Sequence, residues 1–234
     1  RIGSLQVAYR YQACKDVGGD FYDLIFHSEN RISVLIADVA GKGVPAALFM
    51  EYSKTLLASH IPRNLDPVTT LSRVNQEIYR KSRNGIFVTT MLVQIEADLN
   101  RLRLASAGHN NQVLYRNRTG ECQKLRARGA PLGVFEDTEY SESIVSYERG
   151  DVLILYTDGV TEANNPALEE YGEERLFAVV EAARGSGPCT SSVALKLTTR
   201  PFSSLSFVSA HLRAAVRASG TKSQSFPASS LKIR

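Results

Sequence analysis

Three aspartates stand at the ends of apolar runs, each beside glycine, and their residue type suits the binding of a divalent cation. Asp20 follows two glycines and opens the strand-like run 20–26, whereas Asp38 closes the run 32–39. Asp158 ends a third apolar run and precedes a glycine. Carboxylates with no His or Cys nearby favour Mg²⁺, Mn²⁺ or Ca²⁺ over Zn²⁺. Because neighbouring carboxylates repel one another unless a cation compensates them, a shared rim would be a metal site.

Each aspartate taken singly has a simpler interpretation as a turn residue that caps a strand. Three such endings together favour metal ligation over that alternative. Asp23 shares a strand face with Phe21 and is expected to point away from Asp20, which indicates a structural role.

Other polar residues near these motifs leave alternatives open. His109 could act as a general acid, but a buried imidazole bonded to the backbone is the favoured interpretation. Lys42 could attract a phosphate or remain a solvated loop residue. Glu162 is interpreted as a charge at a helix N-terminus. The glycines flanking Lys42 predict a tight turn, since the spacing of a phosphate-binding P-loop is absent.

Strand and helix signals alternate in a way that predicts α+β layering rather than repeated β-α units. Asp66 and Pro67 are typical of a helix start, and residues 27–31 are predicted to form a polar hairpin loop. The expected strands are 5–11, 20–26, 32–39, 89–95, 101–106, 112–115, 122–125, 144–147 and 152–157, and the expected helices are 44–59, 67–82 and 172–183.

Composition favours a globular cytoplasmic protein without a membrane span. The chain has 234 residues, 43% of them hydrophobic, and no apolar run of membrane-spanning length. Its three widely spaced cysteines match no zinc or disulfide pattern, which favours a reducing compartment. The first residue is not methionine, so a preceding domain is expected.

The charge distribution divides the chain into residues 1–184 and a Ser-rich basic tail, 185–234. The tail holds seven of the 28 Lys and Arg and none of the 24 acidic residues, so residues 1–184 carry a net charge of −3. A uniformly basic nucleic-acid binder is therefore not indicated. The tail is either a flexible extension or a sequence altered by a shifted reading frame. Within it, 193–197 is expected as a strand and 207–218 as a helix.

Five motifs together resemble the SpoIIE/RsbU-like branch of the metal-dependent protein phosphatase 2C (PPM) family. The resemblance runs over about residues 1–180 and implies an α-β-β-α sandwich of two antiparallel sheets flanked by helices. The motifs are Val17–Asp23, Ala37–Gly43, Ser106–Asn110, Gly129–Gly133 and Thr157–Ala163.

The resemblance also implies hydrolysis of phosphoserine or phosphothreonine on a protein, with two Mn²⁺ or Mg²⁺ ions and a metal-activated water. Asp38 would bridge the ions, Asp20 and the carbonyl of Val39 would complete the first site, and Asp158 would bind the second ion. The implied substrate is a phosphorylated STAS-type anti-sigma-factor antagonist. An N-terminal sensor or receiver domain would regulate the enzyme, and a homodimer is compatible with this assignment.

One expected ligand is missing. The family supplies a further aspartate to the second ion from an acidic pair before a final strand, and the tail has no acid. Ser191–Leu195 or Ser229–Lys232 could occupy that place, but hydroxyls bind hard cations more weakly than carboxylates. The second metal site is therefore expected to be weak or empty. The alternative function is a catalytically weak or inactive module that binds a partner.

Overall fold

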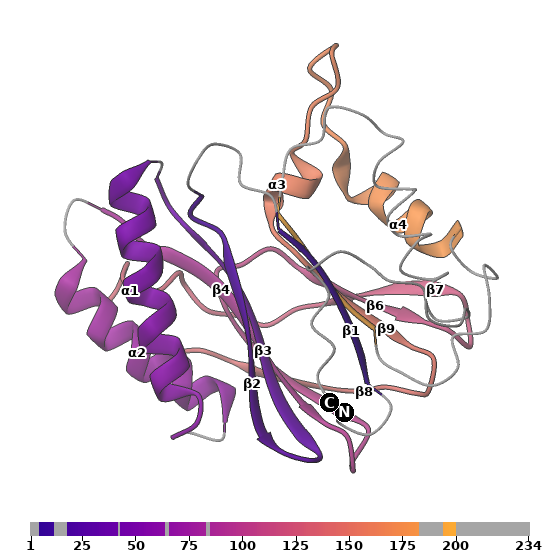
Figure 1. The fold of residues 1–234 in the computed structure, drawn as a ribbon, viewed down its shortest axis with the longest axis horizontal. Helices are drawn as coiled ribbons and strands as arrows, with labels where there is room; N and C mark the ends of the chain where they lie inside the picture. Colours follow the sequence, from indigo (N-terminus) through magenta and orange to yellow (C-terminus); the bar gives the residue numbers. More distant parts are fainter. Residues whose placement is uncertain are drawn as a thin grey trace, which may run out of the picture.

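Two five-stranded sheets lie face to face, with helices on both outer sides (Figure 1). The computed structural model describes residues 5–11, 18–41, 43–63, 66–82, 85–182 and 194–199. The predicted α+β sandwich is confirmed by this arrangement.

One sheet is antiparallel throughout and carries the first two aspartate motifs. Its strand order is β2-β3-β4-β5-β8, and β2 pairs with β3 so that Phe21 lies opposite Ala37. The bounds are β2 Phe21–Ser28, β3 Arg31–Val39, β4 Val88–Glu96, β5 Arg101–Ala107 and β8 Glu142–Ser146.

The second sheet is mixed, which differs from the purely antiparallel expectation. Its order is β1-β10-β9-β6-β7, and β10 pairs in parallel with both β1 and β9. The remaining pairs, β9 with β6 and β6 with β7, are antiparallel. The bounds are β1 Gln6–Tyr11, β6 Gln112–Arg116, β7 Glu121–Leu125, β9 Val152–Tyr156 and β10 Ala194–Thr199.

The helices form the outer layers because each buries an apolar face on one sheet. Helices α1 (Val44–His60) and α2 (Pro67–Lys81) share a core cluster with the β2-β3-β4-β5-β8 sheet. Helices α3 (Asp158–Thr161) and α4 (Gly172–Ala182) share another with β6 and β9. Asp66 caps α2 as predicted, since its side chain accepts hydrogen bonds from the second and third residues of that helix.

Strand β3 lies between β2 and β4 in its sheet and is apolar on both faces. Ile32, Val34 and Ile36 enter the core between the sheets, while Leu35 and Ala37 face the helices. This alternation is the period of two that a strand imposes. A strand buried on both sides is held rigidly, so it is a firm support for a carboxylate near its end.

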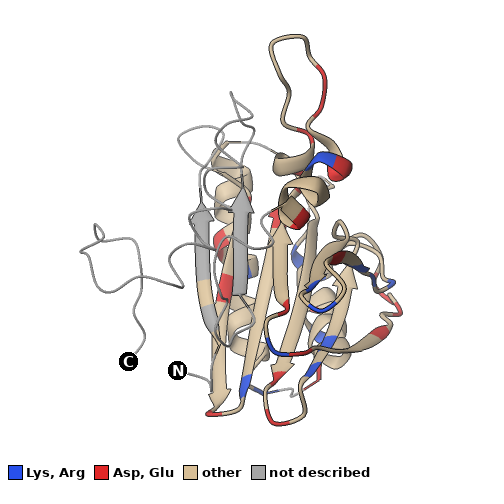
Figure 2. Ribbon diagram, turned by 90° about the vertical axis from the view of Figure 1, so that its right-hand side faces the viewer, with Lys and Arg blue, Asp and Glu red and all other residues tan. Residues whose placement is uncertain are grey.

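Charged positions lie mainly on helices, turns and strand ends, and the drawn middles of the strands carry few of them (Figure 2). The hairpin predicted over 27–31 is shorter than expected, because β2 extends to Ser28 and β3 begins at Arg31. The predicted helix 207–218 lies outside the described residues. None of the described helices combines the length and the apolar character needed to cross a bilayer.

Candidate metal centre

The three predicted aspartates occupy the ends of three strands. Asp20 immediately precedes β2, Asp38 is the penultimate residue of β3, and Asp158 begins α3 two residues after β9. Since β2 and β3 are antiparallel neighbours, the start of one lies beside the end of the other. The mutual electrostatic effects of these aspartates show that their carboxylates lie near one another.

Asp20 and Asp38 form a carboxyl pair in hydrogen-bond contact. Burial raises the pKa of Asp20 above its ordinary value, and the charge of Asp158 acts in the same direction. Burial also raises the pKa of Asp38, to about 8, and the hydrogen bond and charge of Asp20 add to this effect, followed by the charge of Asp158. Without a cation, such a pair is expected to hold a shared proton.

A hydroxyl from the other sheet orients one member of this pair. The Oγ1 atom of Thr157 donates a hydrogen bond to Oδ2 of Asp20 at 3.0 Å. Thr157 is fully buried and lies between β9 and Asp158. The contact therefore joins the start of β2 to the end of β9, across the two sheets.

Gly19 leaves space beside the expected main-chain ligand. A Cβ atom at this position would lie 2.8 Å from the carbonyl oxygen of Val39 and 3.3 Å from Oδ1 of Asp38. Because real Cβ atoms do not approach an oxygen so closely, only glycine leaves both oxygens in their present places. The cradle contains only hard oxygen donors, which fits Mg²⁺ or Mn²⁺.

The described residues offer candidate metal donors but not a complete cluster of side-chain ligands. Within the described ranges, no three side chains of Asp, Glu, His or Cys are grouped closely enough to hold one metal ion. The candidate donors are the Asp20–Asp38 pair and the carbonyl of Val39, and Asp158 is an exposed carboxylate near them. The expected serine substitutes for the missing aspartate lie outside the described residues.

His109 is buried, as the favoured structural interpretation expects, and its ring interacts with the backbone of Tyr156 as well as with a side chain. Its Nδ1 atom lies 2.9 Å from Oγ1 of Thr89, and its main-chain N–H donates to Oγ of Ser106 at 3.2 Å. Burial lowers the pKa of His109 to about 4, so the ring is neutral at neutral pH. A neutral, enclosed imidazole is poorly suited to deliver a proton to a leaving group.

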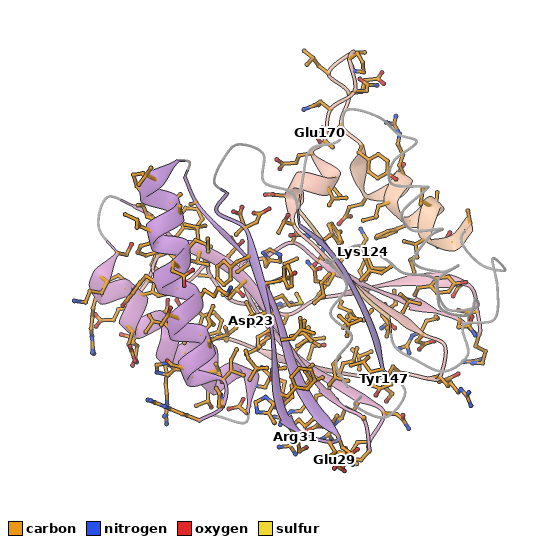
Figure 3. The ribbon with its side chains drawn as sticks, in the orientation of Figure 1. Asp23, Glu29, Arg31, Lys124, Tyr147 and Glu170 are labelled. Atoms are coloured by element: carbon orange, nitrogen blue, oxygen red, sulfur yellow. The ribbon has the colours of Figure 1, made fainter. Side chains whose placement is uncertain are left out.

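The structure describes two of the three remaining polar residues singled out in the sequence, Asp23 and Glu162. Asp23 lies partway along β2, away from the strand end, and accepts a hydrogen bond from the N–H of Leu24 at 2.8 Å (Figure 3). The interpretation of Glu162 as a helix N-terminal charge is wrong, because it follows α3 at the C-terminal end. The charge of Asp158 is the main cause of its raised pKa. Lys42 lies outside the described residues.

Sequence reasoning assigned no role to Thr157, although it stands directly beside a predicted ligand. Its position in the motif was the available signal. It carried no chemistry by itself, because the partner of Thr157 is 137 residues away in the sequence.

The two-sheet sandwich with its outer helices has the fold of PP2C-type phosphatase domains. The solved structure of the PP2C phosphatase domain and a fragment of the regulatory domain of SpoIIE from Bacillus subtilis matches 88% of this chain and 56% of its own, with a TM-score of 0.64 and 17% identity. RsbX in complex with magnesium matches 87% of this chain and 84% of its own, with a TM-score of 0.53 and 16% identity. At such identities the likeness shows the fold alone.

The sequence itself assigns the chain to a family within that class. The family profile of Stage II sporulation protein E (SpoIIE) matches residues 28–201, and the chain belongs to this family. The phosphoserine phosphatase RsbU of Bacillus subtilis is 31% identical over 182 residues, which cover 75% of this chain and 52% of RsbU. The chain thus spans about half the length of that relative.

Proposed function

We propose that the chain hydrolyses phosphoserine or phosphothreonine on a regulatory protein, with the help of Mn²⁺ or Mg²⁺. The observation that carries this proposal is the Asp20–Asp38 pair, in which two partly buried carboxyls lie in hydrogen-bond contact; burial is the largest cause of both raised pKa values, and the hydrogen bond and charge of Asp20 raise that of Asp38 further. Such crowding is unfavourable unless a cation binds between the groups. The SpoIIE family membership and the similarity to RsbU support phosphoryl hydrolysis as the reaction.

The residues divide the work of holding the ions. Asp20 and the carbonyl of Val39 would hold the first ion, Asp158 would hold the second, and Asp38 would contact both. When bound, the ions supply the Lewis acidity that activates a water and offsets charge on the phosphoryl oxygens. Thr157 keeps the carboxylate of Asp20 in one orientation through its 3.0 Å hydrogen bond.

We further propose that the second ion is bound weakly, and that the substrate is a phosphorylated STAS-type anti-sigma-factor antagonist. The weak second site follows from the exposure of Asp158 and from the absence of any acid after residue 184. The substrate class rests on the family resemblance. We place the enzyme in the cytoplasm, under the control of an N-terminal sensor or receiver domain, and compatible with a homodimer.

The decisive experiment measures phosphate release from a phosphoserine protein by the full chain, with Mn²⁺ and with a chelator. Mn²⁺-dependent turnover that is lost in Asp38→Asn and kept in Asp23→Asn supports the proposal. Asp23 is a matched control, because it lies on β2, the strand that Asp20 immediately precedes. Its carboxylate accepts a hydrogen bond from the adjacent residue, Leu24.

A second outcome distinguishes the alternative function. Stoichiometric binding of the phosphoprotein without turnover, at any Mn²⁺ concentration, would identify a partner-binding module. The observation that favours it is the lack of a three-residue metal cluster in the described ranges. Calorimetry should show one tight Mn²⁺ site, and two tight sites would contradict the weak second site.

A further inference from the structure

The side chain of Gln112, the first residue of β6, makes a paired hydrogen bond with the main chain at the end of β9. Its Oε1 accepts from the N–H of Tyr156 at 2.6 Å, and its Nε2 donates to the carbonyl of Tyr156 at 3.0 Å. Gln112 is completely buried. Both hydrogen-bonding groups of one β9 residue are thus satisfied by one amide 44 residues away in the sequence.

This contact takes the place of a missing step in the sheet. The main-chain ladder between β6 and β9 ends at the pair Val113 and Ile154. The next residue of β9 on that side is Tyr156, which has no opposite residue in the ladder. The amide of Gln112 offers one donor and one acceptor, as a peptide does, and so extends the ladder by one pair. Asn110 Nδ2 adds a further hydrogen bond to the same carbonyl at 3.0 Å.

Tyr156 is the last residue of β9 and immediately precedes the two candidate site residues of this segment. Thr157, which holds Asp20, follows it directly, and Asp158 is the next residue. The chain turns here from a strand into the four-residue helix α3, and Tyr156 is held on one side by its pairing with Thr198 of β10 and on the other by Gln112. The place of Asp158 therefore depends on where the main chain of Tyr156 is held.

The loop before Gln112 also reaches β4, the neighbour of the strand that carries Asp38. His109 contacts the hydroxyl of Thr89 at 2.9 Å, and Thr89 lies opposite Asp38 in the ladder between β4 and β3. The hydroxyl of Thr89 also lies 3.5 Å from the carbonyl oxygen of Asp38, at the limit of a hydrogen bond. Residues 109–112 thus connect the end of β9 to the end of β3.

We propose that Gln112 is a positioning residue for the metal centre, acting through the main chain of Tyr156 on Thr157 and Asp158. The hydrogen bonds of its amide go to the main chain of Tyr156 and Asn110. The proposal rests on the proposed function, because it assumes that these carboxylates bind a cation. Groups that orient metal ligands from behind the site change metal affinity by about 10- to 100-fold when they are removed.

The competing explanation is that Gln112 only satisfies buried polar groups and stabilises the fold. Gln94 provides a matched control for that effect. It is also buried, at 2% exposure, and lies within β4, yet its Oε1 has no hydrogen-bond partner among the described residues. A Gln→Met substitution preserves most of the side-chain length in both places and removes the amide.

The experiment compares Gln112→Met, Asn110→Ala and Gln94→Met in the full chain. Mn²⁺ affinity is measured by titration calorimetry, thermal stability in a chelator, and KM and kcat with a phosphoserine protein. We expect about a tenfold loss of Mn²⁺ affinity and a lower kcat at unchanged KM in Gln112→Met. Asn110→Ala should also lower the Mn²⁺ affinity and kcat, but less than Gln112→Met does. Gln94→Met should keep the wild-type Mn²⁺ affinity.

Wild-type Mn²⁺ affinity in Gln112→Met, with stability lowered as in Gln94→Met, would overturn the proposal and leave the proposed function intact. If Gln112→Met does not fold, Asn110→Ala decides, because it leaves the paired hydrogen bond in place and removes only one contact to Tyr156. An unchanged affinity in Asn110→Ala would then count against the proposal. Failure of the wild-type chain to bind Mn²⁺ would instead refute the proposed function and, with it, this inference.

Discussion

Replacing Asp38 by asparagine should stabilise the metal-free protein at alkaline pH, although it removes the central ligand. In the folded state the pKa of Asp38 is raised from 3.8 to about 8, chiefly by burial and then by the hydrogen bond and charge of Asp20. A carboxyl with a raised pKa stabilises the fold fully only below the pKa of the unfolded chain. That stability is lost as the pH rises from about 4 through about 8.

The magnitude follows from the size of the shift. At about 1.36 kcal/mol per pKa unit, complete ionisation of Asp38 would oppose folding by roughly 5–6 kcal/mol. The side chain is only half-buried and shares its proton with Asp20, so solvent screening reduces this figure. We expect roughly 1–3 kcal/mol of unfolding free energy to be recovered by Asp38→Asn at pH 8.5. The amide can also donate a hydrogen bond to Asp20, which a carboxylate cannot.

The assay is urea unfolding in a chelator at pH 5 and pH 8.5, for the wild type, Asp38→Asn and Asp23→Asn. Asp38→Asn should be more stable than the wild type at pH 8.5, and the difference should shrink at pH 5. With excess Mn²⁺ the order should reverse, because ligand binding stabilises only the protein that can bind. A metal-free Asp38→Asn that is less stable than the wild type at pH 8.5 would refute the reasoning.

Two further predictions concern the surroundings of the pair, and a third concerns the cap of α2. Gly19→Ala should weaken Mn²⁺ binding measured by calorimetry, because its Cβ would lie 2.8 Å from the carbonyl oxygen of Val39; an unchanged affinity would show that this carbonyl is not a ligand. Thr157→Val should lower kcat several-fold by freeing the carboxylate of Asp20, with unfolding free energy reduced by about 1 kcal/mol; equal activity would argue against this orienting role. Asp66→Ala removes the α2 cap and should cost about 1 kcal/mol in urea unfolding while leaving kcat per folded molecule unchanged.

The sequence predicted the aspartates well because their signals are local. An apolar strand pattern that ends at an acidic residue beside glycine can be read within ten residues, and Asp20, Asp38 and Asp158 all lie at strand ends. The helix start at Asp66 was equally local. Their roles as metal ligands stay a prediction.

The features that the sequence did not predict depend on contacts between distant segments. The amide of Gln112 finds Tyr156 across 44 residues, and neither side chain carries a local signal for that pairing. The parallel ladders of β10 were missed for the same reason, because a short apolar run does not state which neighbours it will pair with. Glu162 was misplaced because α3 is only four residues long, which is too short for a helical period.

The position of β10 has a consequence for how the protein is made. Strand β1 pairs with β10. During synthesis, residues 6–11 therefore cannot form this pairing until residues 194–199 have left the ribosome. Pairing between such distant parts of a chain is slow, and until it forms the unpaired edge of β1 is prone to aggregation. A ribosome that stalled before Ala194 would release a chain whose β1 and β9 both lack this shared neighbour.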